Sequence, residues 1–160
     1  MASDNNKALS EYVHRRRVQF YETDAAGIVH FSWFFRYMEE AEHALWRAAG
    51  LSIHPPDSPI GFARTAAACD YKRPLRFEDE FDVTIRIEAI SRKTIQYSCV
   101  MTKDGVTLAT GSMTVICVRN EPNGSIKAMN IPEEIASRFA VADNTADVGA
   151  DAGADTGAGV

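Results

Sequence analysis

The sequence has few of the residues that mark metal sites, disulfide frameworks and membrane spans. Its three cysteines, Cys69, Cys99 and Cys117, are widely spaced, and none belongs to a C-x-x-C pair. This pattern indicates neither a zinc site nor a set of disulfides. No apolar run approaches the roughly 18 residues that a membrane helix needs, and residues 1–10 lack the apolar segment of a secretory signal. We therefore expect a protein of the reducing cytoplasm that does not associate with membranes.

Motifs for nucleotide and metal chemistry are missing as well. The sequence contains no G-x-x-x-x-G-K-[ST], G-x-G-x-x-G or H-E-x-x-H motif, and no serine stands in G-x-S-x-G. Nucleotide hydrolysis, dinucleotide redox chemistry and zincin-type proteolysis therefore have no support. The net charge of −5 argues against a dedicated nucleic-acid binder. We expect neither a metal nor a resident cofactor, and no nucleic-acid partner.

The composition predicts one folded body between two looser ends. A chain of 160 residues suits a single domain with a real core. Residues 1–10 are predicted to form a flexible leader. Residues 141–160 consist mainly of Ala, Asp, Gly, Thr and Val, which cannot bury enough apolar surface to offset the entropy of ordering, so they are predicted to be disordered. The folded domain is expected over residues 11–140.

One long amphipathic helix is the clearest element of this body. Ser32 is a plausible N-cap and Gly50 a plausible residue after the C-terminus, which predicts a helix over about 33–49. Residues at steps of four, three, four and three form one apolar stripe along it: Phe34, Met38, Ala41, Leu45 and Ala48. Such a stripe predicts that the helix packs against the rest of the domain.

Strands are predicted on both sides of this helix. Residues 12–21 are rich in Val, Phe and Tyr, residues 60–71 contain a plausible short strand, and residues 81–89 and 95–101 alternate between apolar and other side chains. Asp104-Gly105 and Asn123-Gly124 are turn signals around a strand over 106–118, and a short helix opens near Pro132. This order predicts an α+β domain with a mostly antiparallel sheet and the long helix across one face. Exposed edges of such a sheet favour dimerisation.

A carboxylate precedes the long helix. Asp24 lies in a short loop that contains Gly27, and backbone N–H groups near Phe31 and Ser32 follow at the expected helix start. The first N–H groups of a helix lack internal partners and favour negative charge. A hydrolase that attacks a carbonyl needs this combination, with a nucleophile or general base beside donors for an oxyanion. An ordinary turn aspartate, bonded to its own loop, is the alternative interpretation.

Further polar residues have two interpretations each. His30 is an acid–base or substrate-binding candidate, or a histidine packed at the helix start. Arg92 and Lys93, at an expected turn between strands, and Lys127, after the Asn123-Gly124 turn, are candidates for phosphate contact.

Two other charged groups are expected to be solvated. Residues 14–17, His-Arg-Arg-Arg, form the strongest basic run, but alternation along a strand divides them between two sheet faces, so a solvated strand is favoured over a phosphate site. Glu39 and Glu40 could present a carboxylate to a cleft, but charges on a helix face are more often solvated.

The segment that contains Asp24 resembles a known family. Residues 18–31, VQFYETDAAGIVHF, and residues 35–41, FRYMEEA, resemble the hotdog-fold acyl-CoA thioesterases of the 4-hydroxybenzoyl-CoA thioesterase class. Residues 71–79, YKRPLRFED, resemble that family's entry into its third strand. The likeness extends over about 12–140. It implies a hotdog fold, in which a long central helix is wrapped by an antiparallel sheet.

The resemblance implies roles for particular residues. Asp24 would attack the thioester carbonyl or activate water, the Phe31 N–H would polarise the carbonyl oxygen, and Gly27 would allow close backbone approach. A looser similarity implies that Arg92, Lys93 and Lys127 meet the coenzyme A phosphates. Family members form homodimers, often paired into tetramers, with active sites at the dimer interface. An acyl-CoA substrate and a homodimer or homotetramer are therefore expected.

One position narrows the resemblance, and two other functions stay open. Relatives of the Tol–Pal-associated branch have a histidine seven residues after the aspartate, where this sequence has Phe31. Phe31 instead resembles branches that act on aromatic or naphthoyl-type thioesters through the aspartate without that histidine. The alternatives are a hotdog enoyl-CoA hydratase or dehydratase, which needs a paired acid and base, and a non-catalytic acyl-CoA-binding protein.

Overall fold

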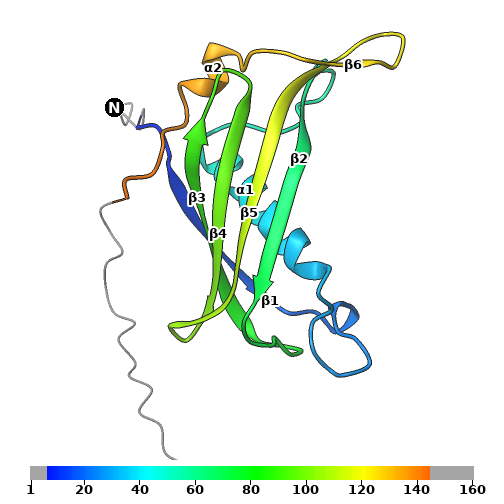
Figure 1. Cartoon of the computed structure of the whole chain (residues 1–160), viewed down its shortest axis with the longest axis vertical. Coiled ribbons are helices and arrows are strands. Elements are labelled where there is room, and N and C mark those ends of the chain that lie inside the picture. The colour runs from blue at the N-terminus through cyan, green and yellow to red at the C-terminus, as the bar shows by residue number, and fades with distance from the viewer. Residues whose placement is uncertain (1–6, 145–160) are drawn as a thin grey trace, which may run out of the picture.

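The structure is a computed structural model that describes residues 7–144. A single antiparallel sheet curves around one long helix, α1 (Figure 1). The strand order in the sheet is β1-β3-β4-β5-β2, and β6 pairs with one end of β5. The predicted α+β class and the antiparallel sheet are confirmed. The strands are β1 (Glu11–Arg17), β2 (Ile60–Tyr71), β3 (Glu80–Ile90), β4 (Thr94–Lys103), β5 (Val106–Asn120) and β6 (Ile126–Ala128).

Helix α1 (Trp33–Ala48) follows the predicted bounds closely. The apolar stripe is buried from Phe34 to Leu45, with Met38, Ala41 and Leu45 completely buried, whereas Ala48 at its end is exposed. The helix ends at Ala48, and Gly50, two residues later, has a φ of +76° that suits a residue without a side chain. The Gly50 N–H donates to the Arg47 carbonyl and the next N–H donates to the Trp46 carbonyl, a pattern that stops a helix by satisfying its last carbonyls.

The core lies between α1 and the concave face of the sheet. Alternate residues of β3 and β4 point into it, as their sequence pattern predicts, and these side chains are at most 2% exposed: Phe81, Val83, Ile85, Ile87, Ile95, Tyr97, Cys99 and Met101. Trp46 of α1 packs edge-on against Phe62 and donates its indole N–H to the Tyr97 hydroxyl at 3.0 Å. The hydrogen bond satisfies two polar groups that would otherwise be costly to bury.

Both predicted turns are present. Asp104 and Gly105 have φ values of 49° and 75° between β4 and β5, as a tight hairpin turn requires. Gly124, with φ of 82°, donates its N–H to the Glu121 carbonyl before β6. The short helix α2 (Glu133–Ala136) begins after Pro132, close to the predicted position.

The first predicted strand, over residues 12–21, was too long. Strand β1 ends at Arg17, and a 3₁₀ helix, η1 (Phe20–Glu22), follows it. The Glu22 carboxylate is completely buried and accepts the Gln19 N–H at 2.9 Å, which bends the chain into a turn. The apolar and aromatic residues between 18 and 21 are typical of a strand, which is why the prediction was too long. The local structure is instead determined by the Glu22 carboxylate, which caps the start of η1.

The described ends are tied to the sheet. Leu9 donates its N–H to the Arg138 carbonyl and accepts the Ala140 N–H, and the Ala142 N–H donates to the Ile87 carbonyl. Residues 1–6 and 145–160, which hold most of the predicted leader and tail, lie outside the described residues. Over residues 7–144 the three cysteines are free, and no helix is long and apolar enough to cross a bilayer.

Candidate active site

The loop between η1 and α1 closes on itself around Asp24. The Asp24 N–H donates to the Ile28 carbonyl at 2.8 Å, and the Asp24 carbonyl accepts the Gly27 N–H at 2.9 Å. One carboxylate oxygen, Oδ1, also accepts the Ala26 N–H at 2.8 Å. Gly27 has φ of +75°, in the left-handed region that favours glycine. The predicted role of Gly27 as a turn former is consistent with this geometry, while its role in catalysis stays a prediction.

The start of α1 leaves one backbone donor free beside this loop. The Ser32 N–H donates to Nδ1 of His30 at 3.3 Å, and the Trp33 N–H donates to the His30 carbonyl at 3.0 Å. Within residues 7–144 the Phe31 N–H has no acceptor. The dipole of the helix adds partial positive charge at this end. A backbone donor without a partner at a helix start is suited to bind a developing oxyanion.

Asp24 and Phe31 lie on one cavity of about 470 Å³. Strand β2 and the loop after it form the opposite wall. The Tyr71 hydroxyl donates to the Phe31 carbonyl at 3.0 Å, and the Tyr71 ring meets Phe34 edge-on at 5.0 Å. The other lining residues are Ile28, Val29, Lys72, Arg73 and Pro74. The residues that line the cavity therefore include an aspartate, a residue whose N–H has no acceptor within residues 7–144, three aromatic residues and two cationic ones.

His30 is in the loop but does not line this cavity. Its Nδ1 makes a 2.8 Å hydrogen bond with the Ser32 hydroxyl, and its ring lies 4.4 Å from the Phe31 ring. These contacts agree with the packed histidine of the alternative interpretation. An acid–base role for His30 stays a prediction.

The predicted phosphate contacts gather at the other end of the sheet. The Lys93 carbonyl accepts the Cys117 N–H, and Lys127 pairs with Arg119 two residues further along β5, so Arg92, Lys93 and Lys127 share one end. Tyr71, on the Asp24 cavity, pairs with Ala109 of the same strand. Eight residues of strand separate positions 109 and 117, or roughly 26 Å. Within one protomer these cations therefore do not line the Asp24 cavity.

Sequence reasoning missed the cations that do line the cavity. Lys72 and Arg73 follow directly on β2, in the run YKRP, which by resemblance marks only the entry into the next strand. The Lys72 and Arg73 N–H groups both donate to the Leu108 carbonyl, which fixes the turn that brings this run beside Phe31. Residues 31 and 73 are far apart in the chain, and the folded structure brings them together: the Val29 N–H donates to the Leu75 carbonyl at 2.8 Å, and the Tyr71 hydroxyl donates to the Phe31 carbonyl.

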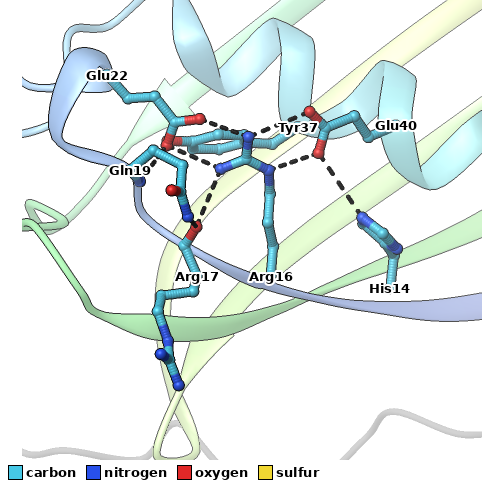
Figure 2. Close-up of polar contacts among 7 residues, drawn as sticks. All are labelled: His14, Arg16, Arg17, Gln19, Glu22, Tyr37 and Glu40. Carbon is cyan, nitrogen blue, oxygen red and sulfur yellow. Dashed lines mark hydrogen bonds and ion pairs between the residues drawn. The ribbon is translucent and has the colours of Figure 1, made fainter.

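An ionic cluster centred on Arg16 holds η1, the 3₁₀ helix that directly precedes the loop (Figure 2). Arg16 of β1 lies between two carboxylates, Glu22 of η1 and Glu40 of α1. Its Nη1 donates to Glu22 Oε2 at 2.8 Å, and its Nε donates to Glu40 Oε2 at 2.5 Å. Tyr37 adds a hydroxyl that donates to Glu22 at 2.8 Å, and its ring lies 4.5 Å from the Arg16 guanidinium carbon. The expectation of a solvated strand was therefore wrong for Arg16, whose side chain is 14% exposed.

The cluster shifts the titration of its members. Burial alone would raise the pKa of Glu22, but hydrogen bonds from Arg16, the Gln19 N–H and Tyr37 lower it below its usual value. Burial and the Glu22 charge raise the pKa of Tyr37. For Arg16, the two carboxylates outweigh burial and raise the pKa. The ion pair is thus fully charged at neutral pH.

Metal ligands are not clustered near this site. Among residues 7–144, no three or more His, Cys, Asp or Glu side chains lie close enough together to hold an ion. The polar residues at the cavity offer a carboxylate that can attack a carbonyl carbon and a backbone N–H that can polarise the carbonyl oxygen. Their cations can bind an anionic group such as a phosphate.

Comparison with known proteins identifies relatives of one kind. A family model described as the thioesterase-like superfamily matches residues 18–139. A relative from Aquifex aeolicus, provisionally named an esterase, is 38% identical over 125 residues, which make up 78% of this chain and 94% of the relative. A 1,4-dihydroxy-2-naphthoyl-CoA hydrolase from Synechococcus elongatus is 24% identical over 116 residues, covering 71% of this chain and 85% of that protein.

A solved structure agrees with these relatives. The structure of a gentisyl-coenzyme A thioesterase superposes with a TM-score of 0.71 at 28% identity, over 81% of this chain and 100% of that chain. The predicted hotdog fold and the predicted thioester hydrolase are both confirmed at the level of the family. With its Asp24 loop, its helix start and a family match that covers residues 18–139, the chain belongs to the thioesterase-like superfamily.

Proposed function

We propose that this protein hydrolyses the thioester of an aromatic acyl-CoA and uses Asp24 as its catalytic carboxylate. One observation carries the proposal: Asp24 and Phe31, whose N–H has no acceptor within residues 7–144, line the same cavity. The Ala26 N–H engages Oδ1 at 2.8 Å, which orients the carboxylate and leaves Oδ2 for chemistry. The names of two relatives, a gentisyl-CoA and a naphthoyl-CoA hydrolase, agree with this reaction.

The reaction has two forms that use the same groups. In the first, Asp24 Oδ2 forms a bond to the thioester carbon, and the oxyanion that develops accepts the Phe31 N–H. Collapse breaks the C–S bond, coenzyme A leaves as a thiolate, and water then hydrolyses the mixed anhydride to free acid and the Asp24 carboxylate. In the second, Asp24 takes a proton from a water molecule that attacks directly. The thiolate is a good leaving group, so neither form needs His30 as an acid.

An aromatic acyl group fits the walls of the cavity. Phe31, Phe34 and Tyr71 present ring edges and faces, and ring pairs of this kind add about 0.5–1.5 kcal/mol beyond the area that they bury. Lys72 and Arg73 at the same cavity carry the charge that phosphate groups of coenzyme A would meet.

A homodimer along β2 would bring the distant cations into use. Within residues 7–144 strand β2 is an edge of the sheet, and Ala66, Ala67 and Ala68 form an exposed stretch between its two charged residues, Arg64 and Asp70. Two copies that pair antiparallel along β2 run in opposite directions. The Arg92–Lys93 turn of the partner would then lie toward the Asp24 end of this protomer. We propose that these cations and Lys127 contact coenzyme A across such a dimer.

The test compares Asp24→Asn with a matched variant, Asp57→Asn. Asp57 is also an exposed loop aspartate, and its φ of 61° is one that asparagine tolerates. With benzoyl-CoA and acetyl-CoA as substrates and free thiol as the readout, we expect Asp24→Asn to lower kcat by about 10²–10⁴-fold and Asp57→Asn to leave it unchanged.

The outcomes separate the candidate functions. Equal hydrolysis by Asp24→Asn and the native protein would remove Asp24 from the mechanism. Binding of benzoyl-CoA without turnover by the native protein would instead favour a non-catalytic binding protein. Light scattering on the same samples gives the mass, and a monomer with full activity would refute the dimer.

A further inference from the structure

The Asp24 loop is held at both ends by one residue, Glu22. The Glu22 carbonyl accepts the His30 N–H at 2.9 Å, and Thr23 bridges to Val29, so the chain from 24 to 28 is a closed excursion between these pairs. Asp24 follows Glu22 by two positions, and the free Phe31 N–H follows His30 by one. A displacement of Glu22 therefore moves both the carboxylate and the oxyanion donor.

Glu22 is in turn held by its side chain, which has no solvent exposure. Four hydrogen bonds reach this carboxylate: two from the Arg16 guanidinium, one from the Tyr37 hydroxyl and one from the Gln19 N–H. The three residues that donate these hydrogen bonds lie on different elements: Arg16 on β1, Tyr37 on α1 and Gln19 at the start of η1. The carboxylate is thus the point at which the loop is attached to the rigid body of the domain.

Arg16 is the only cation that the structure places on Glu22 within residues 7–144. It also reaches across to Glu40 on α1, so it links η1 to the same helix whose start carries Phe31 (Figure 2). Without the guanidinium, the Glu22 carboxylate would be left as a buried charge with no cation, whereas the Glu40 side chain is 39% exposed and stays in contact with water. An uncompensated buried charge is strongly destabilising, so we expect Glu22 and the loop attached to it to shift.

We propose that Arg16 is a positioning residue for the proposed thioester hydrolysis. Through Glu22 and Glu40, Arg16 fixes the position of Asp24 relative to the Phe31 N–H. The inference rests on the proposed function. Arg16 touches neither the cavity nor a reacting atom. Its effect is geometric, and a displacement of about 1 Å at a reacting group can cost on the order of 10²-fold in rate.

The test uses Arg16→Met with a matched control, Arg15→Met. Arg15 is the next residue of β1, faces the opposite side, and makes ion pairs with Glu80 and Asp82 at 3.6 and 3.4 Å with its side chain 64% exposed. With benzoyl-CoA we expect Arg16→Met to lower kcat by about 10–100-fold with KM within about threefold. Arg15→Met keeps both constants. Added guanidinium ion, which can enter the space left by the side chain, is expected to restore part of kcat.

A conservative variant covers the case in which Arg16→Met does not fold. Arg16→Lys keeps the charge but has one ammonium group in place of the planar fork, and it can contact Glu22 or Glu40 well but not both. Its kcat is expected to lie between those of Arg16→Met and the native enzyme.

Amide exchange then reads the positioning directly. The His30 N–H, bonded to Glu22, is expected to exchange faster in Arg16→Lys, while the Ala49 N–H at the far end of α1 keeps its native rate. A general loss of stability would instead accelerate both amides.

The two proposals fail in different ways. A native enzyme that hydrolyses benzoyl-CoA, together with unchanged kcat and unchanged His30 exchange in Arg16→Met or Arg16→Lys, overturns this inference alone. Equal acceleration at His30 and Ala49 also overturns it, because Arg16 would then be a general stabiliser. A native protein that hydrolyses no thioester overturns the proposed function and the inference with it.

Discussion

Helix α1 can lie against the sheet only because β5 has no side chain at Gly111. The position is central in the sheet, between Cys69 of β2 and Cys99 of β4, and its φ is not unusual. A Cβ there would lie 2.3 Å from Met38 Sδ and 2.9 Å from the Ala68 carbonyl oxygen. Glycine inside a strand often marks such a close approach.

The size of the clash sets the expected cost of Gly111→Ala. Non-bonded atoms prefer separations of about 3.5–4.0 Å, so the Met38 sulfur would have to retreat by at least about 1.2 Å. Methionine is flexible enough to move, but the Ala68 oxygen belongs to the backbone of β2 and moves only with its strand. Overpacking of this kind costs about 1–3 kcal/mol, or a fall in Tm of roughly 2–12 °C for a chain of this length.

Gly61→Ala is the matched control for this substitution. Gly61 is also a strand glycine, and a Cβ there would meet Val118 and Asn120 at 3.7 Å, an ordinary contact distance. Thermal and urea unfolding of both variants is the assay, and we expect Gly61→Ala to stay within about 0.5 kcal/mol of the native protein.

A double variant identifies the source of the cost. Combining Gly111→Ala with Met38→Ala removes the contact with sulfur and leaves the contact with Ala68, so the two costs are expected to be less than additive. Native-like stability of Gly111→Ala, or equal losses in the two glycine variants, would refute the packing argument.

Two further predictions concern titratable groups of the core. Against the effect of burial, hydrogen bonds from Arg16, the Gln19 N–H and Tyr37 hold the pKa of Glu22 below its usual value, so the folded state resists protonation that the unfolded state accepts. This stabilisation is complete above the usual pKa of a glutamate and is lost as the pH falls through the folded pKa. Glu22→Gln is therefore expected to flatten the acid side of the stability profile measured by urea unfolding, and an identical slope in both proteins would contradict this. Burial raises the pKa of the Cys99 thiol to about 12, so iodoacetamide at pH 8 is expected to leave Cys99 unmodified in the native protein and to modify it in urea, as peptide masses can establish. Rapid alkylation of native Cys99 would show that this part of the core opens.

The sequence predicted those elements whose pattern repeats along one stretch of chain. The stripe from Phe34 to Ala48 and the Gly50 stop define α1, and strict alternation defines β3 and β4. The end of β1 could not be predicted in this way. Whether Phe20 continues a strand depends on the Glu22 carboxylate, which bends the chain only because Arg16 and Tyr37 make its burial favourable.

The candidate site divides in the same way. Asp24, Gly27 and the helix start are neighbours in the chain, so the sequence brings them together. Tyr71 and Arg73 reach the cavity because their segment is hydrogen-bonded to residues 29 and 31, a long-range contact that residue spacing does not encode. Alternation along residues 14–17 did predict that Arg16 lies on the opposite sheet face from Arg15 and Arg17. The two carboxylates that accept its hydrogen bonds, however, are six and 24 residues away in the chain.

The two interpretations of Asp24 do not compete. An ordinary turn aspartate binds the N–H two residues ahead, and Asp24 Oδ1 does so with Ala26. That bond uses one of two oxygens and holds the carboxylate plane fixed, which a nucleophile or base also needs. What distinguishes this turn from others is what lies around it. Among the described residues the neighbouring N–H of Phe31 has no acceptor, and the loop is tied through Glu22 to an ion pair far more buried than an ordinary turn requires. A turn that served only to reverse the chain would gain nothing from either feature.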